Sequence, residues 1–261
     1  MQLIKPLSII CSLFLLVACS QDATVSKPES STLVVGFTNV PLDASRVVVR
    51  GRESLIGNLI SDALLFEAQS DGESLDGSLI NGGGIRFDSV RHSDGIYPAG
   101  ELTEDDIHEM LPFGNTGVVV QMTGSDIKSS FERSVHALPI LGDNLGSGAF
   151  LQVSHNFMVT VDLSQTSQIV DELSETPSIL TSGERIQSIL INGENLVPDQ
   201  TYNILVPNFI ADGGDSYVAL ANIPESKKKR LNIDLVEPLI DYIKTQGVVS
   251  PILEDRIIIN E

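Results

Sequence analysis

The arginines near residue 50 are the side chains best suited to bind an anion. Arg46 and Arg50 flank three valines, and this β-branched run is typical of a strand. A strand has a side-chain period of two, so both guanidiniums are expected on one face. There they repel each other unless an anion or a carboxylate lies between them. The alternative is an ordinary surface pair that is matched by two of the many acidic residues.

A glycine-rich turn follows a short strand expected at residues 77–80. In the stretch from Asn81 to Arg86, three consecutive glycines let a ligand approach the backbone, and the two end residues add an amide and a guanidinium. The spacing is not that of a dinucleotide fingerprint, and no Gly-Lys-Ser/Thr follows as in a phosphate loop. The turn alone is therefore weak evidence for a ligand.

Two phenylalanines stand beside glycine turns. Phe113 lies in Leu-Pro-Phe-Gly-Asn, which ends at Asn115, and Phe209 lies six residues before Asp215 in a second glycine-rich segment. The chain has nine Phe, four Tyr and no Trp, so two aromatics in loops predict a slot for a planar ring. Asp215 could bind a vicinal diol through both carboxylate oxygens. The alternative places both phenylalanines in the core at loop ends.

The histidines do not form a metal-binding pattern. Asp106-Ile107-His108 spells D-x-H, but it lies in an acidic helix that begins after Thr103, and His108-Glu109 lacks the second histidine of H-E-x-x-H. We therefore expect a solvated helix face at these residues and no metal bound by this chain. The other histidines are scattered along the sequence: His92, His136 and His155.

The N-terminus has the pattern of a bacterial lipoprotein signal. Residues 1–18 hold one lysine and an apolar run too short to span a bilayer, and Leu16-Val17-Ala18-Cys19 matches the lipidation pattern. The alternative is an ordinary secretory signal. We expect cleavage before a lipidated Cys19, a flexible tether over residues 19–33 and a folded domain over 34–261. Ser20 after Cys19 favours the outer membrane, facing the periplasm.

The charge of the chain limits its partners. The sequence has 35 acidic and 16 basic residues, a formal charge of −19, which disfavours nucleic acid and anionic lipid surfaces. A small anion is not excluded, because it needs only a few arginines at one place. The basic run at residues 227–230 is expected to be a solvated loop before a helix at residues 235–244.

Strands and helices alternate along the chain without a repeat of fixed period, which predicts an α/β or mixed α+β fold. Helices are expected at residues 55–68, from Thr103 to Pro112, and from a Ser125 cap to about residue 137. Further strands are expected at residues 118–122, 157–161, 186–191 and 202–206.

Taken together, these stretches resemble the C-terminal domain of the 5′-nucleotidase family. The matching segments are residues 50–63, 81–86, 111–115, 148–153 and 207–217, in family order and at family spacing, and they cover about residues 40 to 220. The resemblance implies layered sheets and helices and a nucleotide-binding role. It also implies phosphate ligands at Arg46, Arg50 and Arg86, a base sandwich of Phe113 and Phe209, polar groups near the base at Asn81 and Asn115, a backbone contact at Gly148 and a ribose-hydroxyl acceptor at Asp215.

The catalytic half that the resemblance implies is not found in this sequence. The family holds two metal ions in an N-terminal metallophosphatase domain, and no Gly-Asn-His or Gly-His-x-His segment occurs here. We therefore expect no hydrolysis by this chain alone and no cofactor on it, with divalent metals only on a partner. Three hypotheses for the function of the chain remain. It docks a separately encoded metallophosphatase subunit, it is a nucleotide- or nucleoside-binding envelope lipoprotein without chemistry, or it is an interaction scaffold.

Overall fold

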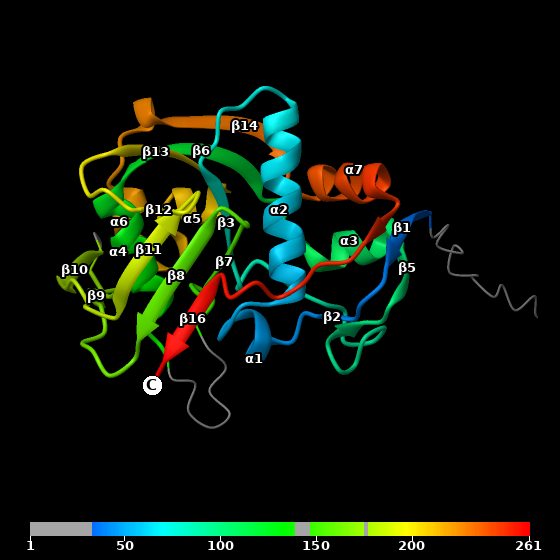
Figure 1. Cartoon of the computed structure of the whole chain (residues 1–261), viewed down its shortest axis with the longest axis horizontal. Coiled ribbons are helices and arrows are strands. Elements are labelled where there is room, and N and C mark those ends of the chain that lie inside the picture. Colours follow the sequence, from blue (N-terminus) through cyan, green and yellow to red (C-terminus); the bar gives the residue numbers. More distant parts are fainter. Residues whose placement is uncertain (1–32, 139–146, 175–176) are drawn as a thin grey trace, which may run out of the picture. The chain divides into compact units, whose positions relative to one another are not determined.

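A five-stranded sheet lies at the centre of the fold in the computed structural model, which describes residues 33–138, 147–174 and 177–261 (Figure 1). Strands β13 and β3 are parallel, and the other neighbouring pairs are antiparallel. In sheet order the strands are β14 (Lys228–Asp234), β6 (Thr116–Thr123), β13 (Thr201–Pro207), β3 (Gly77–Asn81) and β7 (Leu151–Val153).

Both faces of the central sheet are buried, because neighbouring residues of its strands enter two different hydrophobic clusters. Leu79 and Val118 pack into one cluster, and the next residues, Ile80 and Val119, pack into the other. This alternation follows from the side-chain period of a strand. It explains why β3 is buried at all five positions and why its sequence is a continuous run rather than an alternating one.

Helices cover one face of the central sheet (Figure 1). This layer consists of α2 (Leu55–Ser70), α3 (Glu104–Met110) and α7 (Val236–Gln246). Beside it lie a three-stranded sheet of β15 (Val248–Val249), β1 (Val34–Thr38) and β5 (Gly100–Thr103), and a pair of β2 (Leu42–Asp43) and β4 (Ile96–Tyr97).

A four-stranded sheet and short helices cover the other face. The sheet has the order β12 (Glu194–Asn195), β11 (Ile186–Ile191), β8 (Phe157–Asp162) and β16 (Ile257–Asn260). The helices are α4 (Gly124–Ser134) and α6 (Val218–Ala221), and a hairpin of β9 (Ile169–Asp171) and β10 (Ser178–Thr181) completes this side. The expectation of a mixed α/β fold in layers is therefore confirmed.

Two helices begin with reciprocal capping boxes. Thr103 caps α3 and Thr123 caps α4, and in each case an aspartate at the third helical position accepts a hydrogen bond from the cap residue's backbone. The expected cap at Ser125 was wrong. The strand β6 runs to Thr123, so its hydroxyl is placed to accept from Asp126 N, and Ser125 donates from its Oγ to the Pro198 carbonyl instead.

The run Arg46-Val47-Val48-Val49 is a helical turn, α1 (Arg46–Val49), and not the expected strand. Only Val49 is buried, and the run pairs with no strand among the described residues, so sheet packing does not stabilise its β-branched residues. Residues four apart also share a face in a helix, so Arg46 and Arg50 still lie on the same side. The shared side therefore comes from one helical turn and not from the side-chain period of a strand.

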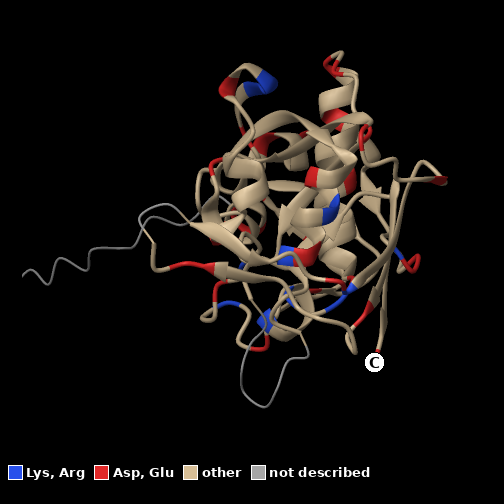
Figure 2. Ribbon diagram, turned by 90° about the vertical axis from the view of Figure 1, so that its left-hand side faces the viewer, with Lys and Arg blue, Asp and Glu red and all other residues tan. Residues whose placement is uncertain are grey.

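The basic run at residues 227–230 is also not the expected loop. Lys227 ends a short 3-10 helix, η2 (Glu225–Lys227), and the next residues form β14 at the edge of the central sheet. Their charges are matched, since Lys229 pairs with Glu73, and Arg230 pairs with Asp212 at 2.7 Å. Figure 2 shows acidic residues on many elements and far fewer basic ones.

The expected signal segment, Cys19 and nearly all of the expected tether lie outside the described residues. In the part of the chain that is described, no helix is both long and apolar enough to cross a membrane.

Candidate functional site

The candidate residues lie at one edge of the central sheet, the edge formed by the ends of its strands and not by the outer strand β14. The parallel strands β3 and β13 both end there, at Asn81 and Pro207, and the antiparallel strands β6 and β7 both begin there. Asn81 pairs with Leu151, and Pro207 pairs with Gly117, so the loops before and after these four strands meet. Four segments far apart in the sequence therefore face one place.

These loops, together with Arg50 from the segment after α1, enclose a cavity of about 550 Å³. Eight of the nine candidate residues line it, together with two further glycines of the glycine-rich turn. The lining residues are Arg50, Asn81, Gly83, Gly84, Arg86, Phe113, Asn115, Gly148, Phe209 and Asp215. The ninth, Arg46, is exposed and does not line the cavity, because it lies one helical turn before Arg50.

Arg50 and Arg86 give the cavity a positive side. Burial is the main cause that lowers the pKa of each guanidinium, and the neighbouring arginines lower the pKa further, while Asp215 opposes them. Arg50 Nε and Arg86 Nη1 are buried, and neither atom has a hydrogen-bond partner among the described residues. Such unpaired buried donors are costly, and an anion bound beside the two guanidiniums would relieve their repulsion.

Phe113 and Phe209 are not core residues. Their exposed fractions are 56% and 44%, and they enter the cavity from different segments, the loop before β6 and the helical turn α5 (Asn208–Ala211). Gly214 allows the Phe209 ring to lie where it does, because a Cβ at that position would be 2.5 Å from the ring. Exposed aromatic rings in a cavity can stack on a planar ligand.

Asp215 is presented to the cavity by an unusual turn. It lies in the 3-10 turn η1 (Gly214–Ser216) with φ 53°, and Ser216 follows at φ 61°, so two consecutive residues with side chains adopt the left-handed region. Asn81 donates from Nδ2 to Asp215 Oδ2 at 2.8 Å. A Cβ at Gly148 would be 3.2 Å from the same carboxylate oxygen, so the glycine leaves space at this wall.

Two buried residues support the site, and no sequence motif assigns a role to either. Gln152 accepts from Ser54 N at 3.0 Å and donates to the carbonyls of Val49 and Arg52, which fixes the backbone on both sides of Arg50. Arg133 donates from Nε to the Asp215 carbonyl at 2.7 Å. Gln152 stands inside the stretch that carried the resemblance, whereas nothing in the sequence marks Arg133.

A group that could hold a cation lies elsewhere in the fold. His92, Asp106 and Glu109 bring their ligand atoms within 4.8 Å of one another. Asp106 is buried, so the expected solvated face was wrong at this residue, whereas His108 is exposed. Arg91 already donates to Asp106 at 2.7 Å and to Glu109 at 2.6 Å, and it supplies the positive charge that these carboxylates need.

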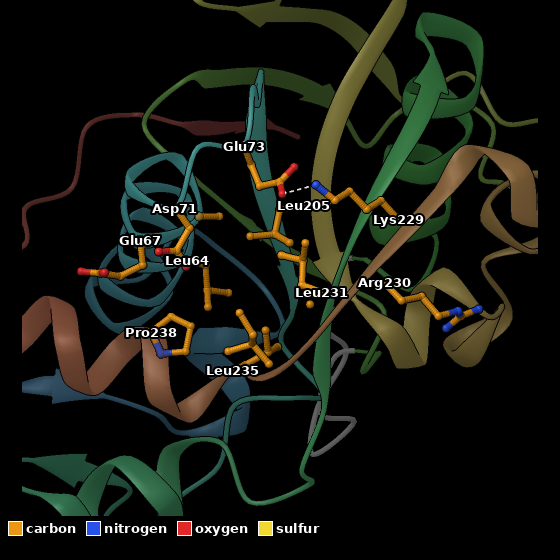
Figure 3. A pocket seen from close by; sticks show the side chains of 13 residues that line it. Leu64, Glu67, Asp71, Glu73, Leu205, Lys229, Arg230, Leu231, Leu235 and Pro238 are labelled. Carbon is orange, nitrogen blue, oxygen red and sulfur yellow. Dashed lines mark hydrogen bonds and ion pairs between the residues drawn. The ribbon is translucent and has the colours of Figure 1, made fainter.

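A second cavity, of about 280 Å³, lies between α2, β14 and α7. Figure 3 shows its aliphatic walls, which include Leu64, Leu205 and Leu235, and the pair of Lys229 and Glu73 at its edge. Among its charged groups, Lys229 pairs with Glu73, and Glu67 has one buried carboxylate oxygen without a hydrogen-bond partner among the described residues. The cavity at the sheet edge differs because unpaired donors, a carboxylate and two exposed rings converge there.

The sequence comparisons agree with this geometry. The family described as 5′-nucleotidase, C-terminal domain, matches residues 34–222. A snake venom 5′-nucleotidase of Macrovipera lebetinus is 33% identical over 232 residues, covering 85% of this chain and 51% of that protein. Human 5′-nucleotidase is 31% identical over 234 residues, covering 87% of this chain and 37% of that protein. The chain thus spans at most about half the length of these two relatives.

Solved structures agree with the fold. The crystal structure of a 5′-nucleotidase precursor from Thermus thermophilus aligns with a TM-score of 0.71 at 32% identity, over 87% of this chain and 39% of that one. The NAD nucleotidase of Haemophilus influenzae aligns at 0.66 with 18% identity, over 88% of this chain and 38% of that one, and shows the same fold. This chain belongs to the 5′-nucleotidase C-terminal domain family.

Proposed function

We propose that the chain binds a nucleoside monophosphate or a nucleoside in the cavity at the sheet edge. The observation that carries this proposal is the convergence of two exposed phenylalanines, two arginines with unpaired buried donors, and Asp215 on one cavity. A nucleotide presents three matching chemistries, which are a planar base, a vicinal diol and a phosphate. Phe113 and Phe209 would hold the base, Asp215 the diol, and Arg50 and Arg86 the phosphate, with Arg46 adding charge from outside.

The other candidate residues complete this assignment. Asn115 lines the cavity with a side-chain amide, the Asn81 amide donates to Asp215, and Gly148 offers its backbone where a side chain would crowd Asp215. No group in this set requires a metal for binding. The cavity of about 550 Å³ is in the usual size range for small-molecule sites.

Titration calorimetry of the purified chain in EDTA tests the binding proposal. A panel of nucleosides and their monophosphates should include ligands that bind, and Phe113→Ala or Phe209→Ala should weaken their binding by about 1 to 3 kcal/mol, as base stacking does. Phe37→Ala is the matched control, because Phe37 is also about half exposed (45%) but does not line the cavity. If no ligand of the panel binds, the binding proposal is wrong, and the hypothesis of an interaction scaffold is favoured.

We propose further that the chain serves 5′-nucleotide dephosphorylation together with a separately encoded metallophosphatase subunit. Hydrolysis needs an activated water and neutralisation of charge on the phosphoryl group, for which two metal ions are well suited. The described residues offer arginines at the cavity, and the only group of three or more His, Cys, Asp or Glu side chains close enough to hold a metal is the His92 group, which does not line the cavity. The chain alone should release no phosphate above background, even with zinc or manganese.

The competing proposal is a binding lipoprotein without chemistry, which the same lining residues of the cavity also support. Purification from the native envelope distinguishes the two proposals. A metallophosphatase that copurifies with the chain, and whose activity depends on Asp215 and Phe209, would support joint dephosphorylation. Metal-dependent turnover by the chain alone, abolished by His108→Ala, would contradict both proposals.

Anchoring in the bacterial envelope through a lipid on Cys19, on the outer membrane facing the periplasm, is part of the proposal. Labelling with radioactive palmitate should mark the intact chain and not a Cys19→Ser variant, and the label should fractionate with outer membranes.

A further inference from the structure

The ion pair of Arg133 and Glu172 contacts the turn that presents Asp215, and neither residue of the pair lines the cavity. Arg133 is 6% exposed and lies near the end of α4. Its Nε donates to the Asp215 carbonyl at 2.7 Å, and a terminal nitrogen donates to Glu172 Oε1 at 2.5 Å. The pair therefore holds the backbone of the left-handed turn at Asp215.

The backbone at this turn needs such support. Asp215 and Ser216 are consecutive residues with positive φ, a conformation that is unfavourable for residues with a Cβ and persists where the surroundings hold it. Within the cavity, the Asn81 amide fixes the carboxylate through one oxygen. Arg133 binds the main chain and leaves the carboxylate for a ligand. Without that hydrogen bond, the turn can relax and the carboxylate can leave its position.

We infer that Arg133, paired with Glu172, is a positioning residue that determines how strongly the site recognises the ribose diol. This inference rests on the proposed nucleotide function, in which Asp215 accepts hydrogen bonds from the ribose hydroxyls. Recognition of the diol inside the cavity would then depend on the Arg133–Glu172 contact outside it, between α4 and the segment after β9.

A comparison of adenosine with 2′,3′-dideoxyadenosine tests the inference, because the two ligands differ only in the hydroxyls. The unmodified protein should bind adenosine more tightly, and Asp215→Asn should abolish most of the difference. Arg133→Met keeps much of the side-chain volume and removes the donors. Arg133→Met should weaken adenosine binding by at least about tenfold, because the ribose loses a hydrogen bond to the charged Asp215 carboxylate. The same variant should change dideoxyadenosine binding by less than about twofold.

Two further variants separate positioning from folding. Arg133→Lys keeps one charged donor and should restore part of the diol preference. Glu172→Ala removes the partner, whose side chain is 52% exposed, and should reduce the preference in a folded protein even if Arg133→Met does not fold. An equal loss for both ligands, or a full diol preference in both the Arg133→Met and Glu172→Ala proteins, would overturn the inference. Failure of the unmodified protein to bind either ligand or any nucleotide would instead overturn the proposed function, and the inference with it.

Discussion

The guanidinium carbon of Arg86 lies 5.1 Å from the centre of the Phe113 ring. The contact joins a proposed phosphate ligand to a proposed base-stacking ring, and it is of the cation–π type. Because Phe113 is more than half exposed, water screens the attraction and its strength is modest.

The free protein should show this contact as an energetic coupling. A double-mutant cycle of Arg86→Ala and Phe113→Ala, measured by urea unfolding without ligand, should give an interaction energy of about 0.5 to 1 kcal/mol. The same cycle with Phe209→Ala is the control, since Phe209 makes no cation–π contact among the described residues. A coupling near zero in the first cycle would mean that Arg86 does not rest on the ring in solution.

Arg50 and Arg86 should distinguish a nucleotide from its nucleoside. Alanine at either position should weaken binding of the monophosphate much more than binding of the nucleoside, because a charge-assisted hydrogen bond is lost only when a phosphate is present. Raised salt should have the same selective effect. Calorimetry with adenosine and its monophosphate measures the difference, with Lys244→Ala, a surface residue paired with Glu104, as the control. Equal losses for both ligands would assign these arginines to the fold alone.

The true cap of α4 can be identified by stability measurements. Thr123→Ala removes the acceptor for Asp126 N and should lower the free energy of unfolding by about 1 kcal/mol, as for other helix caps. Ser125→Ala loses only an exposed bond of 3.2 Å to the Pro198 carbonyl and should have a smaller effect in the same urea titration. The reverse order would restore the cap at Ser125.

The stability of the domain should fall in mild acid partly because of His136. Burial is the main cause that lowers the pKa of His136 below its ordinary value of 6.5, and the positive charge of Arg133 lowers it further. The unfolded chain therefore takes up this proton first, so the stability is fully present above about pH 6.5 and is lost as the pH falls towards the folded pKa. His136→Gln should make stability less dependent on pH between 7 and 5, whereas His108→Gln, at an exposed position, should not. Identical slopes for all three proteins would contradict this.

The sequence predicts the location of the site better than its local structure. Glycines, asparagine and aspartate at strand ends are readable because few residues tolerate such turns, and the topology then brings those ends together. The conformation of residues 46–49 is not readable in this way. Three valines favour a strand by propensity, but only Val49 packs into the core and the run pairs with no strand in the described part of the chain, which favours a helical turn.

Residues that act from behind the cavity are the hardest to find in the sequence. Arg133 stands in an amphipathic helix where an arginine usually meets solvent, and its role depends on a carbonyl 82 positions away. Likewise, Asp106 stands on an acidic helix, and its carboxylate pairs with Arg91 from another segment. Such contacts between distant segments have no local pattern.

A crystal structure of the chain with adenosine monophosphate in the absence of divalent metals would test the nucleotide-binding proposal directly. We expect the base between Phe113 and Phe209, the ribose hydroxyls on Asp215 and the phosphate against Arg50 and Arg86. A nucleotide bound in the aliphatic cavity beside β14, or a site at the sheet edge that stays empty at saturating ligand, would contradict it.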